Sequence, residues 1–256
     1  MKSILTAIVM GVIATTTFAD GGNTNKTFNL RFYGLAEQLE YEDAIADETG
    51  QILGVGGEVG LRLGGSLWME CRGELFGGKG DQDTYLVERT ASGSWRKSDT
   101  RAQLDTEYLG VEVVNVFAFM MPISKDIYFK PYAGVGARIW EKRLLEMLDE
   151  DWISIFGVIG CGGGIAVGKD GVLFARIEAR LPFYNEVTSH YSYSGPIPDG
   201  TKLEPDGEFS GYAEVGVNML RMTASLFGET LNVSGPSPSS QEMNTTMYGV
   251  KLGLAF

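Results

Sequence analysis

The sequence of 256 residues contains only two cysteines and one histidine. Two cysteines make a poor disulfide framework, and Cys71 and Cys161 lie in different expected strands, so we expect both thiols to be free. Basic residues are also scarce, because 21 Lys and Arg are set against 33 Asp and Glu, for a net charge of −12. Since nucleic-acid binding requires a basic face, this charge argues against a nucleic-acid partner.

Long hydrophobic runs are missing as well. After the first 19 residues, no segment is continuously apolar over the roughly 18 to 20 residues that a membrane-spanning helix needs. This excludes a helical membrane protein. The near-zero mean hydropathy of −0.02 is still compatible with a membrane-embedded β-barrel, in which only alternate residues face lipid. The 35 glycines favour strands and turns over helices.

The first 19 residues have the pattern of a secretory signal peptide. Lys2 precedes an apolar stretch over residues 4–12, and Ala19 provides a small residue at a plausible cleavage point. We therefore expect residues 1–19 to be a signal peptide, with the mature chain beginning at Asp20. Because position 20 is not a cysteine, a lipoprotein anchor is not indicated.

Ten later segments alternate between apolar and polar residues, as half-buried strands do. Their connections alternate between long and short, which is the pattern of an antiparallel meander that crosses a membrane. Eight strands would follow if residues 210–233 lay outside the membrane. The ten segments are 28–41, 51–63, 66–79, 100–120, 127–142, 152–168, 171–185, 210–219, 222–233 and 246–256.

The last segment carries the most specific pattern. Tyr248, Val250, Leu252, Leu254 and Phe256 share one face of an extended strand, and Lys251 lies on the other face. This ending resembles the closing strand of small bacterial outer-membrane β-barrels of the OmpA-like and porin-like superfamily, although no specific family is identified. The resemblance implies a transmembrane, antiparallel up-and-down barrel over residues 28–256, after a short periplasmic segment over residues 20–27. It also implies outer-membrane lipids, lipopolysaccharide and the barrel-insertion machinery as partners, the last through Phe256.

Charged residues of both signs share the face opposite the apolar stripes. A barrel places such residues in its interior, which is narrow at this strand number, so we expect an internal ion-pair network rather than an open channel. The parity of the fourth segment changes between Glu107 and Glu112, which predicts a bulge near Leu109 and Gly110. The expected network comprises Arg31, Glu58, Arg62, Glu70, Arg72, Glu74, Glu107, Arg138, Arg176, Glu178, Arg180, Glu214 and Lys251. On the seventh segment, Phe174 and Tyr184 are expected on the same inner face.

Two further residue groups concern the membrane surfaces. Aromatic residues near the ends of segments are expected to anchor the barrel at the lipid interface, namely Tyr41, Phe129, Trp140, Trp152 and Phe256. Acidic residues gather near the long loops, where they are either solvated or contact divalent cations at a lipopolysaccharide surface. These groups are Glu40, Glu42, Asp43, Asp47 and Glu48; Glu146, Asp149, Glu150 and Asp151; and Asp199, Glu204, Asp206 and Glu208.

A hydrolase remains an alternative. Asp81 and Asp83 with His190 resemble parts of the omptin-type protease site, in which an Asp pair faces an Asp–His pair, but Thr188 stands where the second pair needs an acid. His190 and Ser192 have the His-x-Ser spacing of lipid A deacylases, without that family's surrounding motif. A lone histidine in a Ser- and Tyr-rich loop is usually an ordinary loop residue.

The favoured interpretation is therefore a structural or surface-interacting outer-membrane barrel, with a lumen filled by side chains and with specificity in its extracellular loops. No catalytic, cofactor-binding or metal-binding residue is assigned. The alternatives are a narrow channel for small solutes and the surface hydrolase described above.

Overall fold

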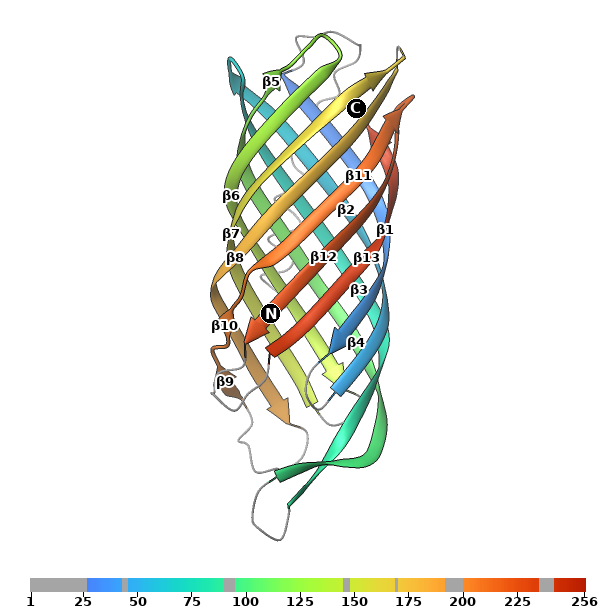
Figure 1. Cartoon of the computed structure of the whole chain (residues 1–256), viewed down its shortest axis with the longest axis vertical. Helices are drawn as coiled ribbons and strands as arrows, with labels where there is room; N and C mark the ends of the chain where they lie inside the picture. Colours follow the sequence, from blue (N-terminus) through green and yellow to red (C-terminus); the bar gives the residue numbers. More distant parts are fainter. Residues whose placement is uncertain are drawn as a thin grey trace.

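The computed structural model shows a barrel of long, tilted strands (Figure 1). It describes residues 27–42, 46–89, 95–144, 148–168, 170–191, 200–234 and 242–256. The signal peptide and most of the short segment after it, over residues 1–26, lie outside the described residues. The strands are β1 (Phe28–Glu42), β2 (Ala46–Gly64), β3 (Leu67–Arg89), β4 (Trp95–Phe119), β5 (Met121–Pro122), β6 (Ile127–Leu144), β7 (Leu148–Val167), β8 (Gly171–Tyr191), β9 (Thr201–Leu203), β10 (Asp206–Gly207), β11 (Ser210–Met219), β12 (Met222–Ser234) and β13 (Glu242–Ala255).

Ten of these strands form the wall, and they correspond to the ten segments expected from the sequence. Each pairs antiparallel with its neighbours, and β13 pairs with both β12 and β1, which closes the barrel. The short connections lie at one end together with Phe256 (Figure 1), and we call this the turn end. Leu220 and Arg221 join β11 to β12 there with φ angles of 51° and 70°, as tight hairpin turns require. No helix in the described part of the chain is long and apolar enough to span a membrane.

Apolar side chains cover the outside of the wall. At the end of the chain, the side chains of β13 residues Tyr248, Val250, Leu252 and Leu254, and of Phe256 after it, are 37–62% exposed. Lys251, on the opposite face, is 1% exposed, which confirms the two faces expected for this strand. Other strands continue the same apolar belt around the barrel. Cys71 and Cys161 are free thiols on two strands that do not pair with each other, as expected.

Several strands extend beyond the belt at the other end, which carries the long connections and which we call the loop end (Figure 1). Because of this extension, the predicted bulge in β4 and the predicted inward position of Glu107 are wrong. The β3–β4 register is continuous past Leu109 and Gly110, so the expected bulge is absent there. Glu107 points outward and forms an exposed ion pair with Lys79, 2.8 Å long, rather than joining the interior. The parity does not change on β4; instead, its outer face becomes polar where the strand passes beyond the apolar belt.

A bulge that was not predicted lies in β8. Ile155 pairs with Tyr184 and Phe156 pairs with Pro182, so Phe183 is the extra residue. Beyond it the two faces of β8 exchange, since a bulge adds one residue to a period of two. Tyr184, expected inside, is therefore outside and 39% exposed.

Inside the wall, aromatic rings lie against glycines of neighbouring strands. A Cβ on Gly160 would stand 2.7 Å from the ring of Tyr132, and one on Gly136 would stand 2.5 Å from the ring of Phe156. These glycines let large side chains lie flat across the lumen. The arrangement helps to fill a narrow interior with few residues.

Candidate binding site

Charged side chains from most of the wall strands meet in the middle of the lumen. Six are basic and six are acidic, and together we call them the charged plug. β7 gives no charged group to it and instead presents inward residues such as Phe156 and Val158, which are buried. The charged plug comprises Arg31, Arg72, Arg138, Arg176, Arg180 and Lys251 with Glu58, Glu74, Glu112, Glu178, Glu214 and Glu229.

The ion pairs of the plug are shared rather than isolated. Arg180 contacts Glu229 at 2.6 Å, Glu112 at 3.2 Å and Glu178 at 3.3 Å. Arg138 bridges the same Glu112 and Glu229 at 2.5 and 2.7 Å. Removing one partner of a buried ion pair is strongly destabilising, so a network of shared ion pairs resists rearrangement. The space left among the central groups is about 20 Å³, room for little more than one water molecule.

The structure brings most of the expected network together, with exceptions at its edges. Arg62 is exposed at the turn end, where it donates to the carbonyl oxygen of Gly65 at 2.6 Å. Glu70 is inside but forms a separate pair with Lys130, 2.7 Å long. Glu112 and Glu229 were not predicted, although both share the inward parity of their strands. The even parity of Glu112 was the available signal, and the expectation of a bulge obscured it.

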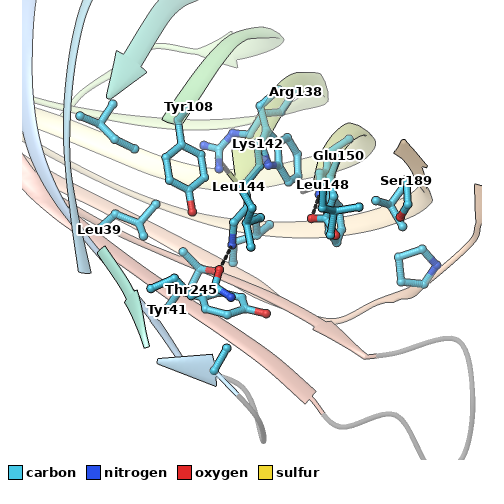
Figure 2. Close-up of a pocket in the computed structure, with 18 of the residues that line it drawn as sticks. Leu39, Tyr41, Tyr108, Arg138, Lys142, Leu144, Leu148, Glu150, Ser189 and Thr245 are labelled. Carbon is cyan, nitrogen blue, oxygen red and sulfur yellow. Dashed lines mark hydrogen bonds between the residues drawn. The ribbon is translucent and has the colours of Figure 1, made fainter. Parts of the chain in front are cut away.

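Between the plug and the loop end, the lumen opens into a cavity of about 300 Å³, which we call the loop-end cavity. Figure 2 shows side chains from several strands converging on it, with Leu39 on one side and Ser189 on the other. Its lining is mainly apolar. The residues are Leu39, Tyr41, Ala46, Ile52, Phe76, Gln82, Thr84, Tyr108, Arg138, Trp140, Lys142, Leu144, Leu148, Glu150, Trp152, Val187, Ser189, Leu203, Pro205, Leu231, Thr245 and Met247.

Three of the aromatic residues expected at the lipid interface belong to this cavity instead. Trp140 and Trp152 stack inside the lumen with ring centroids 5.2 Å apart and planes inclined by 10°. Tyr41 also lines the cavity. The reason is parity, because Trp140 shares its face of β6 with Arg138 and Lys142. Phe129 and Phe256 do point outward near the turn end, at 38% and 37% exposure, as an interface position requires.

The basic groups of the cavity already have partners within the protein. Lys142 bonds to Glu48 Oε2 at 2.7 Å and to Gln82 Oε1 at 2.9 Å. Its ammonium also lies 4.8 Å from the centre of the Tyr41 ring. Glu48 additionally accepts a bond from the hydroxyl of Tyr108 at 2.5 Å. The polar groups at the bottom of the cavity are thus neutralised internally, and the cavity offers mainly apolar surface.

The structure does not assemble the omptin-like residues. Asp81 and Asp83 point away from the lumen, because the inward positions of β3 are the even ones such as Gln82, which lines the cavity. His190 is on the outer face of β8, with its Nε2 3.7 Å from Asp151 on the neighbouring strand. Strands β3 and β8 do face each other across the lumen, as the Arg72–Glu178 ion pair shows, but both sets of residues lie on the outer surface of the wall and therefore do not meet. Ser192 lies outside the described residues.

Most of the described acidic residues lie on strand ends rather than in loops. Glu40, Glu42 and Asp47 lie next to Asp81 and Asp83 in one shallow depression at the loop end. Glu48 and Glu150 turn inward, and Glu150 accepts a bond from Trp152 Nε1 at 3.1 Å. Within the described residues, no group of three or more His, Cys, Asp or Glu is placed to hold a metal ion. Asp43, Glu146 and Asp199 lie outside the described residues.

Among the similar solved structures, one supports the fold. The outer membrane protease OmpT from Escherichia coli superposes with a TM-score of 0.63 at 9% identity, over 93% of this chain and 98% of the protease. The translocator domain of the autotransporter NalP from Neisseria meningitidis gives 0.44 at 9% identity, over 98% and 93%. The attachment invasion locus protein Ail of Yersinia pestis gives 0.32 at 10% identity, over 90% and 100%. No family model and no curated protein match the sequence.

The chain therefore has the fold of bacterial outer-membrane β-barrels, with ten antiparallel strands closed into a barrel. This confirms the fold class and the resemblance that the sequence predicts, and the outer-membrane location agrees with it. At 9% identity the likeness to the protease concerns the fold and not the chemistry.

Proposed function

We propose that this protein is an outer-membrane barrel that is closed to the passage of solutes and that acts by binding at its extracellular end. The charged plug is the observation that carries the proposal. Its ion pairs join opposite walls of the lumen, as between Arg31 on β1 and Glu214 on β11 at 2.6 Å, and between Arg72 on β3 and Glu178 on β8 at 2.5 Å.

The position of the loop-end cavity supports the binding role. It is a concave, largely apolar space with a few polar groups, which is the usual character of small-molecule sites. With the turn end in the periplasm, this cavity and the projecting β3–β4 hairpin are on the extracellular side (Figure 1). Lipids and lipopolysaccharide surround the apolar belt in this proposal, and the insertion machinery reads the last strand with Phe256.

Conductance across planar bilayers tests the closed lumen. We expect the wild-type protein to show no discrete conductance steps. A variant with Glu112→Ser, Arg138→Ser, Arg180→Ser and Glu229→Ser removes two charges of each sign from the plug, and it should conduct ions. The matched control is Lys79→Ser with Glu107→Ser, which removes an exposed pair outside the wall and should remain closed.

Discrete conductance by the wild-type protein would reject the closed lumen and support the narrow-channel alternative. Heat-modifiable migration on gels checks that each variant is a folded barrel before its conductance is compared.

A further inference from the structure

The wall of the barrel is interrupted beside the loop-end cavity. The ladder between β8 and β11 ends at the pair Arg180–Ser210. β8 next pairs on this side with β9, beginning at Val187–Leu203. Within the described chain, residues 181–186 belong to neither ladder. The segment over residues 204–209 runs opposite them, and we call the junction between these two stretches the β8 seam.

Residue chemistry at the β8 seam accounts for the missing ladder. Pro182 has no backbone N–H, and proline in sheets is confined to positions where a ladder bond is not made. The bulge at Phe183 follows immediately and disturbs the pairing further. Gly207 lies against Pro182, since a Cβ at position 207 would contact the Cβ of the proline.

Side chains rather than backbone bonds hold the seam together. With its amide oriented so that both ends are satisfied, Asn185 accepts a bond from Gly207 N at 3.3 Å and donates to Ser154 Oγ at 2.7 Å. Nearer the loop end, Lys202 on β9 pairs with Glu186 at 2.8 Å, and this pair is solvent-exposed at Lys202. A few side-chain contacts open more readily than a continuous ladder, because fewer hydrogen bonds must be broken.

The outer side of the seam is apolar, and so is its inner side next to the loop-end cavity. On the outer side, Leu181, Phe183 and Phe209 are 59%, 65% and 63% exposed and continue the apolar belt. On the inner side, Pro205 lines the loop-end cavity, next to Val187 where the β8–β9 ladder begins. Nearer the turn end, Pro182 instead borders a small space lined by Arg138, Arg180 and Glu229 of the plug. At Pro205, the seam therefore separates the hydrocarbon of the membrane from an apolar cavity by a single layer of side chains.

We propose that the loop-end cavity binds a hydrocarbon chain, which enters from the outer leaflet of the membrane through the β8 seam. The inference rests on the proposed binding role of the extracellular end and names its ligand class and route. A charged ligand is disfavoured, because Lys142 and Arg138 are already paired with Glu48, Glu112 and Glu229. A flexible chain can use both the stacked tryptophans and the aliphatic lining.

Fluorescence quenching by bromine tests the proposal, because Trp140 and Trp152 report directly from the cavity. The protein carries Trp68→Phe and Trp95→Phe, which leaves the two cavity tryptophans, and Cys71→Ala and Cys161→Ala. It is reconstituted into phosphatidylcholine bilayers brominated on the acyl chains. Pro182→Cys with Gly207→Cys provides a disulfide across the β8 seam. This variant is reconstituted either oxidised or reduced.

We expect strong quenching in the reduced form and loss of most of it in the oxidised form, with recovery after reduction. The comparison uses one folded protein in two redox states, so a folding defect cannot imitate the result. A disulfide through Val215→Cys and Leu226→Cys, which face each other in the intact β11–β12 ladder, is the matched control and should not change the quenching. Equal quenching of the oxidised and reduced seam variants would overturn the lateral route.

A second arm separates membrane lipid from dissolved amphiphile as the source of the chain. Brominated dodecanoate is added from water to the oxidised protein in unbrominated bilayers. Quenching by the added acid, without quenching by the lipid, supports a hydrocarbon site whose membrane route is the seam. If the lipid does not quench the reduced protein and the acid does not quench the oxidised protein, the hydrocarbon site is rejected, whereas the closed lumen is judged separately by conductance.

Discussion

The charged plug and the loop-end cavity follow one another along the axis of the same lumen, yet they differ in polarity and in how completely side chains fill them. The plug is polar and filled, with about 20 Å³ of space among its central side chains. The cavity is mainly apolar and encloses about 300 Å³. At the turn end, a third space of about 180 Å³ is again lined by charged groups such as Glu70 and Lys130. Of these three spaces, the loop-end cavity is the mainly apolar one.

The difference shows that filling a barrel depends on complementarity more than on hydrophobicity. Long arginine and glutamate side chains reach across the lumen because each finds an opposite charge from another wall. Apolar side chains of the cavity have no such directional attraction, and they remain near their own strands. Such a cavity remains in the folded protein when a bound ligand, and not a side chain, fills it.

The largest expected effect comes from removing one member of the plug. Arg180→Leu leaves Glu112, Glu178 and Glu229 with fewer partners in a buried site. We expect a loss of about 3–5 kcal/mol in the free energy of unfolding, measured by urea denaturation in lipid vesicles. Arg143→Leu removes an exposed arginine paired with Glu141 and should cost less than about 1 kcal/mol. Equal losses for the two variants would contradict the proposed importance of the plug.

Adding volume beside the plug should cost less, but still measurably. Gly160→Ala places a Cβ 2.5 Å from the backbone oxygen of Ile177 and 2.7 Å from the ring of Tyr132, whose hydroxyl bonds to Glu178 Oε1 at 3.0 Å. Overpacking of this kind typically costs about 1–3 kcal/mol, which the same urea titration would detect. Gly73→Ala is the matched control, because its Cβ meets only the carbonyl oxygen of Glu112 at 3.9 Å. A tolerated Gly160→Ala would mean that the lumen near the plug is less full than described.

Adding volume to the cavity should have the opposite sign. Ser189→Leu extends an apolar side chain into open space, and we expect the protein to gain up to about 1 kcal/mol from the added burial. The thermal unfolding midpoint should rise accordingly. Thr188→Leu lies on the outer face of the same strand and serves as the control. Destabilisation by Ser189→Leu alone would show that the cavity does not accept apolar groups.

The smallest effect is expected at the exposed ion pair of the β8 seam. Lys202→Met should change the free energy of unfolding by less than about 1 kcal/mol, because solvent screens the pair with Glu186. A double-mutant cycle with Glu186→Gln measures the coupling between the two side chains. A coupling free energy of about 3–5 kcal/mol, as large as the loss expected for Arg180→Leu, would mean that this ion pair is a main contact holding the seam closed.

Sequence reasoning recovered the strands and both faces of most of them, because alternation with a period of two is a direct consequence of strand geometry. It also found most of the plug from the inward parity of charged residues. It placed Trp140 and Trp152 in the lipid interface, although Trp140 shares its parity with Arg138. Aromatic residues often lie at lipid interfaces, but the local register of β6 places Trp140 in the lumen.

The remaining features depend on contacts that no single strand reveals. Glu107 looked like a parity change because nothing in the sequence marks where the apolar belt ends and a strand continues into water. The bulge at Phe183 follows Pro182, which was a usable signal for interrupted pairing. The cavity depends on which inward residues fail to meet across the lumen, and that requires the relative positions of all the walls.

Closure of the barrel by β13 has a consequence for the order of assembly. Lys251 bonds to Glu74, 177 positions earlier in the chain, and to the hydroxyl of Tyr212. Contacts this distant are slow to form, because a long loop must close before they contribute. The pairing of β13 with β1 and the placement of its lysine in the plug belong to the same strand and depend on each other. Intermediates that lack it expose two unpaired strand edges and an uncompensated interior carboxylate, so the late stage of assembly should behave as a single cooperative step.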